Sequence, residues 1–85
     1  MKLRRHRNFE KKFQKLPPGV QDAFEERLRL FVQDQFHPVL SHHRLRGKYN
    51  GLRSINITGD YRALFEVYDD IIIFKIIGTH SELYD

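Results

Sequence analysis

Two residues in the last third of the chain are suited to phosphodiester chemistry. Arg62 begins an apolar hairpin, and His80 follows that hairpin within the segment Gly-Thr-His-Ser-Glu-Leu-Tyr, residues 78–84. Histidine suits proton transfer because its unperturbed pKa is about 6.5. Arginine suits phosphate because its planar guanidinium can bind two oxygens at once. The two residues therefore predict a site that holds and cleaves a phosphodiester.

RNA is a phosphodiester that such groups could cleave without a metal ion. Its own 2′-hydroxyl attacks the adjacent phosphate, so the protein must remove that proton and protonate the departing 5′-oxygen. The protein must also stabilise the extra negative charge, which is often the largest contribution to catalysis. His80 is the best candidate for a proton transfer, and Arg62 is the best candidate for the charge.

These residues also have ordinary structural interpretations. His80 could lie in a C-terminal loop without a role in catalysis. Arg62 could form an ion pair with Asp60 or Glu66 instead of binding phosphate. Tyr84 could close the hydrophobic core with its ring, or it could stack on a base near the phosphate. The sequence alone leaves these alternatives open.

A basic segment, residues 41–49, precedes the expected strands and carries two adjacent histidines. His42 and His43 could be surface groups, or one of them could reach the site, and His43 is the better candidate. Their adjacency does not match the i, i+4 spacing of a helical zinc site, and the chain has no cysteine. No glycine-rich phosphate loop is present. We therefore expect neither a metal site nor a cofactor.

Two amphipathic helices are expected before this segment. The first begins at an N-cap on Asn8 and ends at Pro17-Pro18-Gly19, and the second ends before His37-Pro38. Their apolar stripes consist of Phe9, Phe13 and Leu16 in the first helix, and Val20, Phe24, Leu28 and Phe31 in the second. This pattern predicts an αα-hairpin that lies across one face of a sheet.

An antiparallel sheet should lie under these helices. Alternating apolar residues predict strands at 52–57, 61–68 and 71–77, and Leu3 lies in a candidate edge strand. The expected fold is α+β, in a single domain spanning residues 1–85.

A two-residue turn at Asp69-Asp70 would set the register of the last two strands. It pairs Arg62 with Ile77, which brings Arg62 and His80 to one end of the sheet, with Asn56 beside Arg62. The face under the helices should consist of Ala63, Phe65, Val67, Ile72, Phe74 and Ile76. The other face is mixed and should be partly open or covered by a partner; it carries Arg62, Leu64, Glu66, Tyr68, Ile73 and Lys75.

The net charge of +4 is unevenly distributed along the chain. Residues 1–15 and 36–62 are basic, whereas residues 16–35 and 63–85 are net acidic. Two basic blocks indicate a polyanionic partner such as RNA, although Lys and Arg could merely solvate the surface. No apolar run approaches the roughly 20 residues that span a bilayer, and no signal peptide is recognised. We therefore expect a cytoplasmic protein without a membrane partner.

The combined pattern resembles the RelE/ParE superfamily of type II toxins, and most closely its YafQ-like and RelE/StbE-like mRNA interferases. The motifs that carry the resemblance are Leu-Arg-Gly at 45–47, Asp-Tyr-Arg at 60–62 and the segment 78–84. The resemblance implies a RelE-like fold and a ribosome-dependent, metal-independent endoribonuclease that inhibits translation. It also implies a cognate antitoxin protein, with the ribosome and mRNA as further partners, and leaves a homo-oligomer open.

The resemblance assigns catalytic roles to five positions. His43 matches a catalytic histidine of the YafQ-like branch, and Asp60 matches an active-site aspartate of that branch. Arg62 matches the RelE-branch arginine that stabilises the phosphate. His80 matches the C-terminal histidine that acts as acid or base, and Tyr84 lies at an aromatic position. The expected RNA-binding residues are Arg44, Arg46, Lys48, Arg53, Asn56 and Tyr61.

The chain also departs from both branches. Asn56 stands where the YafQ-like branch has another histidine, and Tyr61 stands where it has tryptophan. The segment around Lys48 has fewer lysines than the RelE type. The division of acid and base roles between His43 and His80 therefore stays open.

The superfamily offers a second class of function. ParE-like members bind DNA gyrase and are not nucleases, so gyrase inhibition by binding is an alternative for this chain. They usually lack a histidine in a Gly-Thr-His context, and His80 therefore favours the ribonuclease. A further alternative is a non-toxic relative that serves only as a binding partner.

Overall fold

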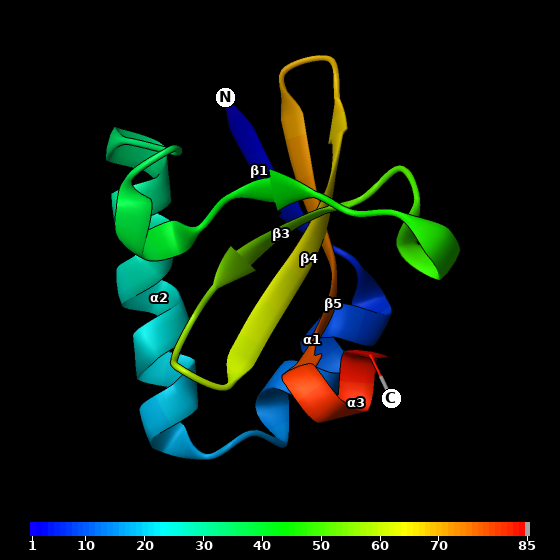
Figure 1. Ribbon diagram of the computed structural model, residues 1–85. Coiled ribbons are helices and arrows are strands. Elements are labelled where there is room, and N and C mark those ends of the chain that lie inside the picture. The colour runs from blue at the N-terminus through cyan, green and yellow to red at the C-terminus, as the bar shows by residue number, and fades with distance from the viewer. Residues whose placement is uncertain (85) are drawn as a thin grey trace.

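A five-stranded sheet with two helices on one face forms the framework of the computed structural model, which describes residues 1–84 (Figure 1). The strands are Lys2–Arg5 (β1), His43–Arg44 (β2), Arg53–Asn56 (β3), Tyr61–Tyr68 (β4) and Ile71–Thr79 (β5). Their order in the sheet is β1-β5-β4-β3-β2. The α+β prediction is confirmed, and so is the edge strand at Leu3. That edge strand is parallel to β5, whereas the other pairs are antiparallel.

Two helices precede most of the sheet in the sequence: Arg7–Gln14 (α1) and Pro18–Gln33 (α2). The N-cap of α1 is His6, not the predicted Asn8, because the His6 Nδ1 atom accepts a hydrogen bond from the Asn8 backbone N–H at 3.0 Å. Pro18 begins α2, where its missing N–H costs nothing. Shorter helical turns are Pro38–Leu40 (η1), Gly47–Tyr49 (η2) and His80–Tyr84 (α3).

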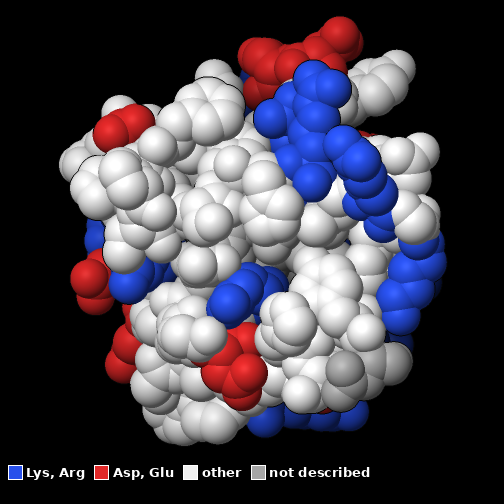
Figure 2. Space-filling view, in the orientation of Figure 1, with Lys and Arg blue, Asp and Glu red and all other residues white. Residues whose placement is uncertain are grey.

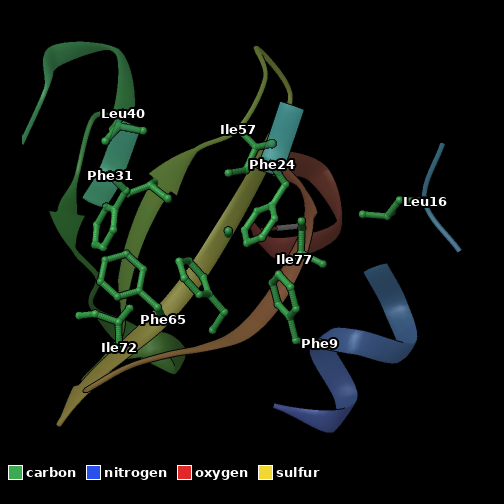
Figure 3. Close-up of a cluster of buried hydrophobic side chains, with 12 residues drawn as sticks. Phe9, Leu16, Phe24, Phe31, Leu40, Ile57, Phe65, Ile72 and Ile77 are labelled. Atoms are coloured by element: carbon green, nitrogen blue, oxygen red, sulfur yellow. The ribbon is translucent and has the colours of Figure 1, made fainter. Parts of the chain in front are cut away.

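Aromatic rings dominate the core between the helices and the sheet. Five phenylalanines are each at most 1% exposed: Phe9, Phe24, Phe31, Phe65 and Phe74. Phe24 lies edge-on to Phe74, with ring centroids 5.3 Å apart, and Phe31 lies edge-on to Phe65 at the same distance. Figure 3 shows the rings from the helices and from the strands pointing toward one another. This core fixes the helices to one face of the sheet and leaves the other face for a site.

A β-bulge at Lys75 alters the predicted register. β4 pairs Phe65 with Phe74, but the preceding residue Leu64 pairs with Ile76, so Lys75 is the extra residue in β5. The two-residue turn at Asp69-Asp70 is confirmed. The register beyond the bulge is nevertheless shifted by one residue from the prediction.

The bulge changes which side chains enter the core. Arg62 faces Gly78 instead of the predicted Ile77, and Ile77 is buried in the core beneath the helices. The predicted helix-covered face is confirmed for Ala63, Phe65, Ile72 and Phe74. It is wrong for Ile76, which the bulge turns to the opposite face, and for Val67, which is 45% exposed. Val67 lies close to the turn of the β4–β5 hairpin, which projects past the helices (Figure 1).

The opposite face has a small core of its own. Leu45, Leu64 and Leu83 are buried together, and Ile76 packs against them. The segment that follows β2 and the helix α3 supply the cover at this end, and the face as a whole is partly open, as predicted. Near the hairpin turn the same face is open, and Tyr68 is 65% exposed there.

The basic segment 41–49 includes regular structure. It contains β2, which adds an edge strand beside β3, and the helical turn η2. None of the helices in residues 1–84 is long and apolar enough to cross a membrane.

Candidate active site

A cleft of about 310 Å³ opens on the face of the sheet opposite α1 and α2, where β2, β3, β4 and α3 meet. Its lining consists of Ser41, His43, Leu45, Ser54, Asn56, Arg62, His80 and Tyr84. Four of the five predicted catalytic residues and one predicted RNA-binding residue therefore lie around one cleft. The fifth, Asp60, does not line it, and neither do the remaining predicted RNA-binding residues.

Strand pairing explains why these side chains meet. His43 of β2 lies opposite Ser54 of β3, and Asn56 of β3 lies opposite Arg62 of β4. Directly opposed residues in antiparallel strands point to the same face. The predicted position of Asn56 beside Arg62 is confirmed, and the pairing carries His43 to the same side of the sheet.

Arg62 is held by the turn that precedes β4. Its Nη1 atom donates to the backbone carbonyls of Thr58 at 3.1 Å, Gly59 at 3.3 Å and Tyr61 at 3.1 Å. Glu66 instead lies 3.9 Å from the ammonium of Lys75. Within residues 1–84 no carboxylate forms an ion pair with Arg62, so the interpretation of Arg62 as a structural ion-pair partner is wrong for that part of the chain.

His80 is the first residue of α3, and a capping box fixes where this helix begins. The Thr79 N–H donates to Glu82 Oε1 at 2.8 Å, and the Glu82 N–H donates to Thr79 Oγ1 at 3.1 Å. Lys12 of α1 donates to the other Glu82 oxygen at 3.2 Å. The Thr79 N–H, and secondly Lys12, lower the pKa of Glu82. The His80 N–H donates to the Asp60 carbonyl at 2.9 Å, which ties α3 to the turn before β4.

Aromatic side chains lie along one side of the cleft. The Tyr84 ring lies 4.8 Å from the His80 ring and stands edge-on to Tyr49 at 5.8 Å. The Tyr49 hydroxyl donates to the Leu83 carbonyl at 2.9 Å, and the Lys48 ammonium lies 5.1 Å from the Tyr49 ring centre. Tyr84 remains 38% exposed, and the buried Leu83 closes the small core instead. A base could therefore stack on Tyr84.

The environment of His43 fixes its tautomer. Its Nδ1 atom lies 2.7 Å from the carbonyl oxygen of Ser41. A carbonyl can only accept a hydrogen bond, so Nδ1 carries the proton and Nε2 of the neutral ring has a free lone pair. His43 is exposed at the edge of the cleft, where this lone pair can accept a proton.

His42 lies on the opposite side of the sheet and away from the cleft. Its Nδ1 donates to the Gln35 carbonyl at 3.0 Å, its Nε2 accepts from Arg53 at 3.3 Å, and its ring stacks on Phe36 at 4.4 Å. Burial, the largest effect, lowers the pKa of His42. Arg44 lies directly opposite Arg53 in the pairing of β2 and β3. Both arginines therefore point to the helix-covered side of the sheet and do not line the cleft, and their contact with RNA stays a prediction.

The predicted residues that remain do not line the cleft: Asp60, Tyr61, Arg46 and Lys48. Asp60 is exposed and contributes only its backbone carbonyl, through the hydrogen bond from His80. Tyr61 packs against the core beneath the helices, because the alternation of β4 turns it away from Arg62, and its contact with RNA stays a prediction. Arg46 and Lys48 are exposed. Figure 2 shows Lys and Arg side chains in a band on the side of the molecule where β2 and η2 lie in Figure 1.

Two polar lining residues were missed by the sequence analysis. Ser54 is fully buried at the cleft, and its hydroxyl has no hydrogen-bond partner among residues 1–84. Its alternation with Asn56 in β3 was a usable signal. Ser41 adopts a left-handed backbone conformation, with φ 48°, from which its carbonyl reaches His43. No sequence signal marks that conformation. Among residues 1–84, no three His, Asp or Glu side chains gather closely enough to hold a metal ion.

Comparisons with known proteins agree with this architecture. A family model described as the bacterial toxin YafQ of a type II toxin–antitoxin system matches residues 1–85. The crystal structure of YafQ from Escherichia coli has a TM-score of 0.81 at 16% identity, covering 98% of this chain and 97% of that one. A copper-bound mutant toxin from Helicobacter pylori has a TM-score of 0.72 at 29% identity and 99% coverage of both chains. No curated protein sequence matches this chain.

A third similar structure is the E. coli DinJ–YafQ complex, with a TM-score of 0.72 at 17% identity, covering 98% of this chain and 97% of that one. The mostly antiparallel sheet with its N-terminal helices defines a RelE-like fold. The family model spans the full chain, and the chain therefore belongs to the YafQ family of toxins from type II toxin–antitoxin systems.

Proposed function

We propose that this toxin is an endoribonuclease that cleaves mRNA on the ribosome and that a cognate antitoxin protein neutralises it. One observation carries the proposal: His43, Arg62 and His80 line one cleft, and no carboxylate within residues 1–84 neutralises the guanidinium. The combination of a fixed positive charge with two groups that transfer protons suits cleavage by the RNA 2′-hydroxyl.

The proposed reaction gives each group one task. His43 Nε2 removes the proton from the 2′-hydroxyl, whose oxygen forms a bond to phosphorus. Arg62 binds the non-bridging oxygens as negative charge accumulates on them. His80, in its protonated form, gives its proton to the 5′-oxygen as the bond from phosphorus to that oxygen breaks. The products are a 2′,3′-cyclic phosphate and a 5′-hydroxyl. The free lone pair that the Ser41 carbonyl leaves on His43 supports this assignment of base and acid.

The shape of the site supports a role for the ribosome. The cleft is small, and His43, His80 and Tyr84 are all exposed at it, so the protein itself encloses little of an RNA strand. Correct orientation of reacting groups contributes strongly to catalysis, and a ribosome could supply it by holding the mRNA. The exposed Arg46 and Lys48 would contact RNA beside the cleft. This substrate would place the protein in the cytoplasm.

Expression in cells tests the proposal. Wild type and His80→Ala are expressed at equal levels while transcript ends and DNA breaks are mapped. Wild type should produce new transcript ends with 5′-hydroxyls, and His80→Ala should not. If His80→Ala arrests growth as wild type does, with gyrase-dependent DNA breaks, the gyrase-binding alternative replaces the proposal. If wild type causes no arrest and no new ends, the protein is a non-toxic relative.

A further inference from the structure

The turn between β3 and β4 is organised by one side chain. The Thr58 hydroxyl oxygen accepts hydrogen bonds from the backbone N–H groups of Asp60 at 3.2 Å and Tyr61 at 3.0 Å. Threonine hydroxyls stabilise tight turns by this kind of local bond. The turn is closed at its base by the Ile57 N–H, which donates to the Tyr61 carbonyl at 2.9 Å. The hydroxyl therefore fixes the direction of the peptide groups within the turn.

Those peptide groups hold Arg62 by one nitrogen. Three carbonyls of the turn region, from Thr58, Gly59 and Tyr61, accept from the same Nη1 atom. The guanidinium is planar and rigid, so binding one nitrogen at three points orients the whole group. Nε and Nη2 take no part in these bonds. The turn thus sets how the fork of Arg62 is presented to the cleft.

The same turn also holds His80. The Asp60 carbonyl accepts from the His80 N–H at 2.9 Å, which connects the turn to the first residue of α3. Arg62 and His80 are 18 positions apart in the sequence, yet both are attached to the one turn. A change in the turn would therefore displace the phosphate-binding group and the proton-transferring group together.

We propose that Thr58 is a positioning residue that aligns Arg62 and His80 on one scissile phosphate; this inference rests on the proposed ribonuclease function. Thr58 does not line the cleft and acts only through the turn. Asp60 is exposed and Tyr61 is only half-buried, so water can replace the bonds that the hydroxyl makes to their N–H groups. Loss of the hydroxyl should therefore preserve the fold and impair the geometry of the site.

Kinetics of two matched variants test the proposal. Thr58→Val keeps the shape of the side chain without the hydroxyl, and Thr58→Ser keeps the hydroxyl. Thr58→Val should lower kcat by about 10²-fold, the cost of misplacing reacting groups by roughly 1 Å, with KM nearly unchanged. Thr58→Ser should retain the wild-type kcat. In an Arg62→Ala background, Thr58→Val should cost less than it does in the wild type, because the two residues act as a unit.

A measurement that needs no activity separates this inference from the proposed function. The NMR signals of the Arg62 Nε–H and the His80 backbone N–H should both shift in Thr58→Val and in Thr58→Ala, but not in Thr58→Ser. If wild type cleaves no RNA, the proposed function fails while these signals still decide whether Thr58 positions both groups. Unmoved signals, a Thr58→Val rate equal to that of an active wild type, or an equal loss in Thr58→Ser would each overturn the inference.

Discussion

The two faces of the sheet differ in how completely the chain covers them. On one face, α1 and α2 bury a continuous set of aromatic rings, including Phe24 and Phe74. On the other face, Leu45, Leu64 and Leu83 form a much smaller apolar core, and the space beside them remains a cleft. The incompletely covered face is the one that collects polar side chains able to act on a substrate.

Two adjacent histidines show the consequence of this difference. His42 faces the covered side, where it stacks on Phe36 and where burial lowers its pKa. His43 faces the cleft, is exposed, and has its tautomer fixed by Ser41. Because side chains of a strand alternate between faces, one step along the chain converts a packing residue into a candidate base. Residue type alone therefore does not determine which histidine can act as a base.

The largest effect on stability should come from removing a core side chain on the helix-covered face. Phe74 is fully buried among four other rings of the core, so Phe74→Ala should lower the free energy of unfolding by about 3–5 kcal/mol. Denaturant unfolding followed by circular dichroism measures this loss. Tyr68→Ala is the matched control on the same hairpin, because Tyr68 is 65% exposed and its loss should change stability by only about 0.5 kcal/mol. Equal losses in both variants would contradict the comparison of the faces.

Changes at the cleft should affect activity more than stability. Arg62→Ala should lower the cleavage rate by about 10²–10³-fold, as when a preorganised donor is removed from a developing anion. Arg62→Lys should also be impaired, because an ammonium keeps the charge but lacks the planar fork. Single-turnover cleavage of a defined RNA on ribosomes measures both rates. Wild-type activity in Arg62→Lys would show that the fork is not required.

Acid should destabilise the covered face through His42. Its pKa is lowered in the folded state, so between that lowered value and about 6.5 the unfolded chain binds more protons than the folded chain. The contribution of His42 to stability is therefore complete above about pH 6.5 and is lost as the pH falls through the folded-state pKa. Urea unfolding at several pH values gives the free energy of unfolding as a function of pH. The fall of this free energy with decreasing pH should be smaller in His42→Gln than in wild type. An unchanged pH dependence of the unfolding free energy in His42→Gln would mean that other groups cause it.

The smallest effect should come from the surface ion pair that links α1 to α3. The side chains of Lys12 and Glu82 are each about half exposed, so Lys12→Ala should cost about 0–1 kcal/mol of stability, and less at high salt. Thermal unfolding at low and high salt measures this contribution. A large loss of stability that is insensitive to salt would indicate that Lys12 stabilises the fold by more than this ion pair.

The helices, the strands β3, β4 and β5, and the closeness of Arg62 to His80 could be predicted from the sequence. Their prediction depended on apolar periodicity and on the turn at Asp69-Asp70, which are local signals. The bulge at Lys75 could not be predicted in the same way. Isoleucines occupy alternate and adjacent positions of β5, so an apolar residue reaches either face in either register.

Other features of the site depend on tertiary contacts. The strand β2 has only two residues, and Arg44 lies opposite Arg53, an unfavourable pair of like charges that no pairing rule favours. The shift caused by the bulge moved the partner of Arg62 from Ile77 to Gly78, yet His80 stayed at the same end of the sheet. The predicted proximity therefore survived an error in register.

The identity of the 3′ end of the cleaved RNA tests the central claim most directly. Purified protein is incubated with ribosomes and a defined mRNA, and the new 3′ ends are identified by mass. Catalysis by His43, Arg62 and His80 through the 2′-hydroxyl predicts a 2′,3′-cyclic phosphate, whose formation falls by about 10²–10⁴-fold in His80→Ala. A 3′-hydroxyl with a 5′-phosphate on the other fragment, or equal formation by His80→Ala, would contradict the account.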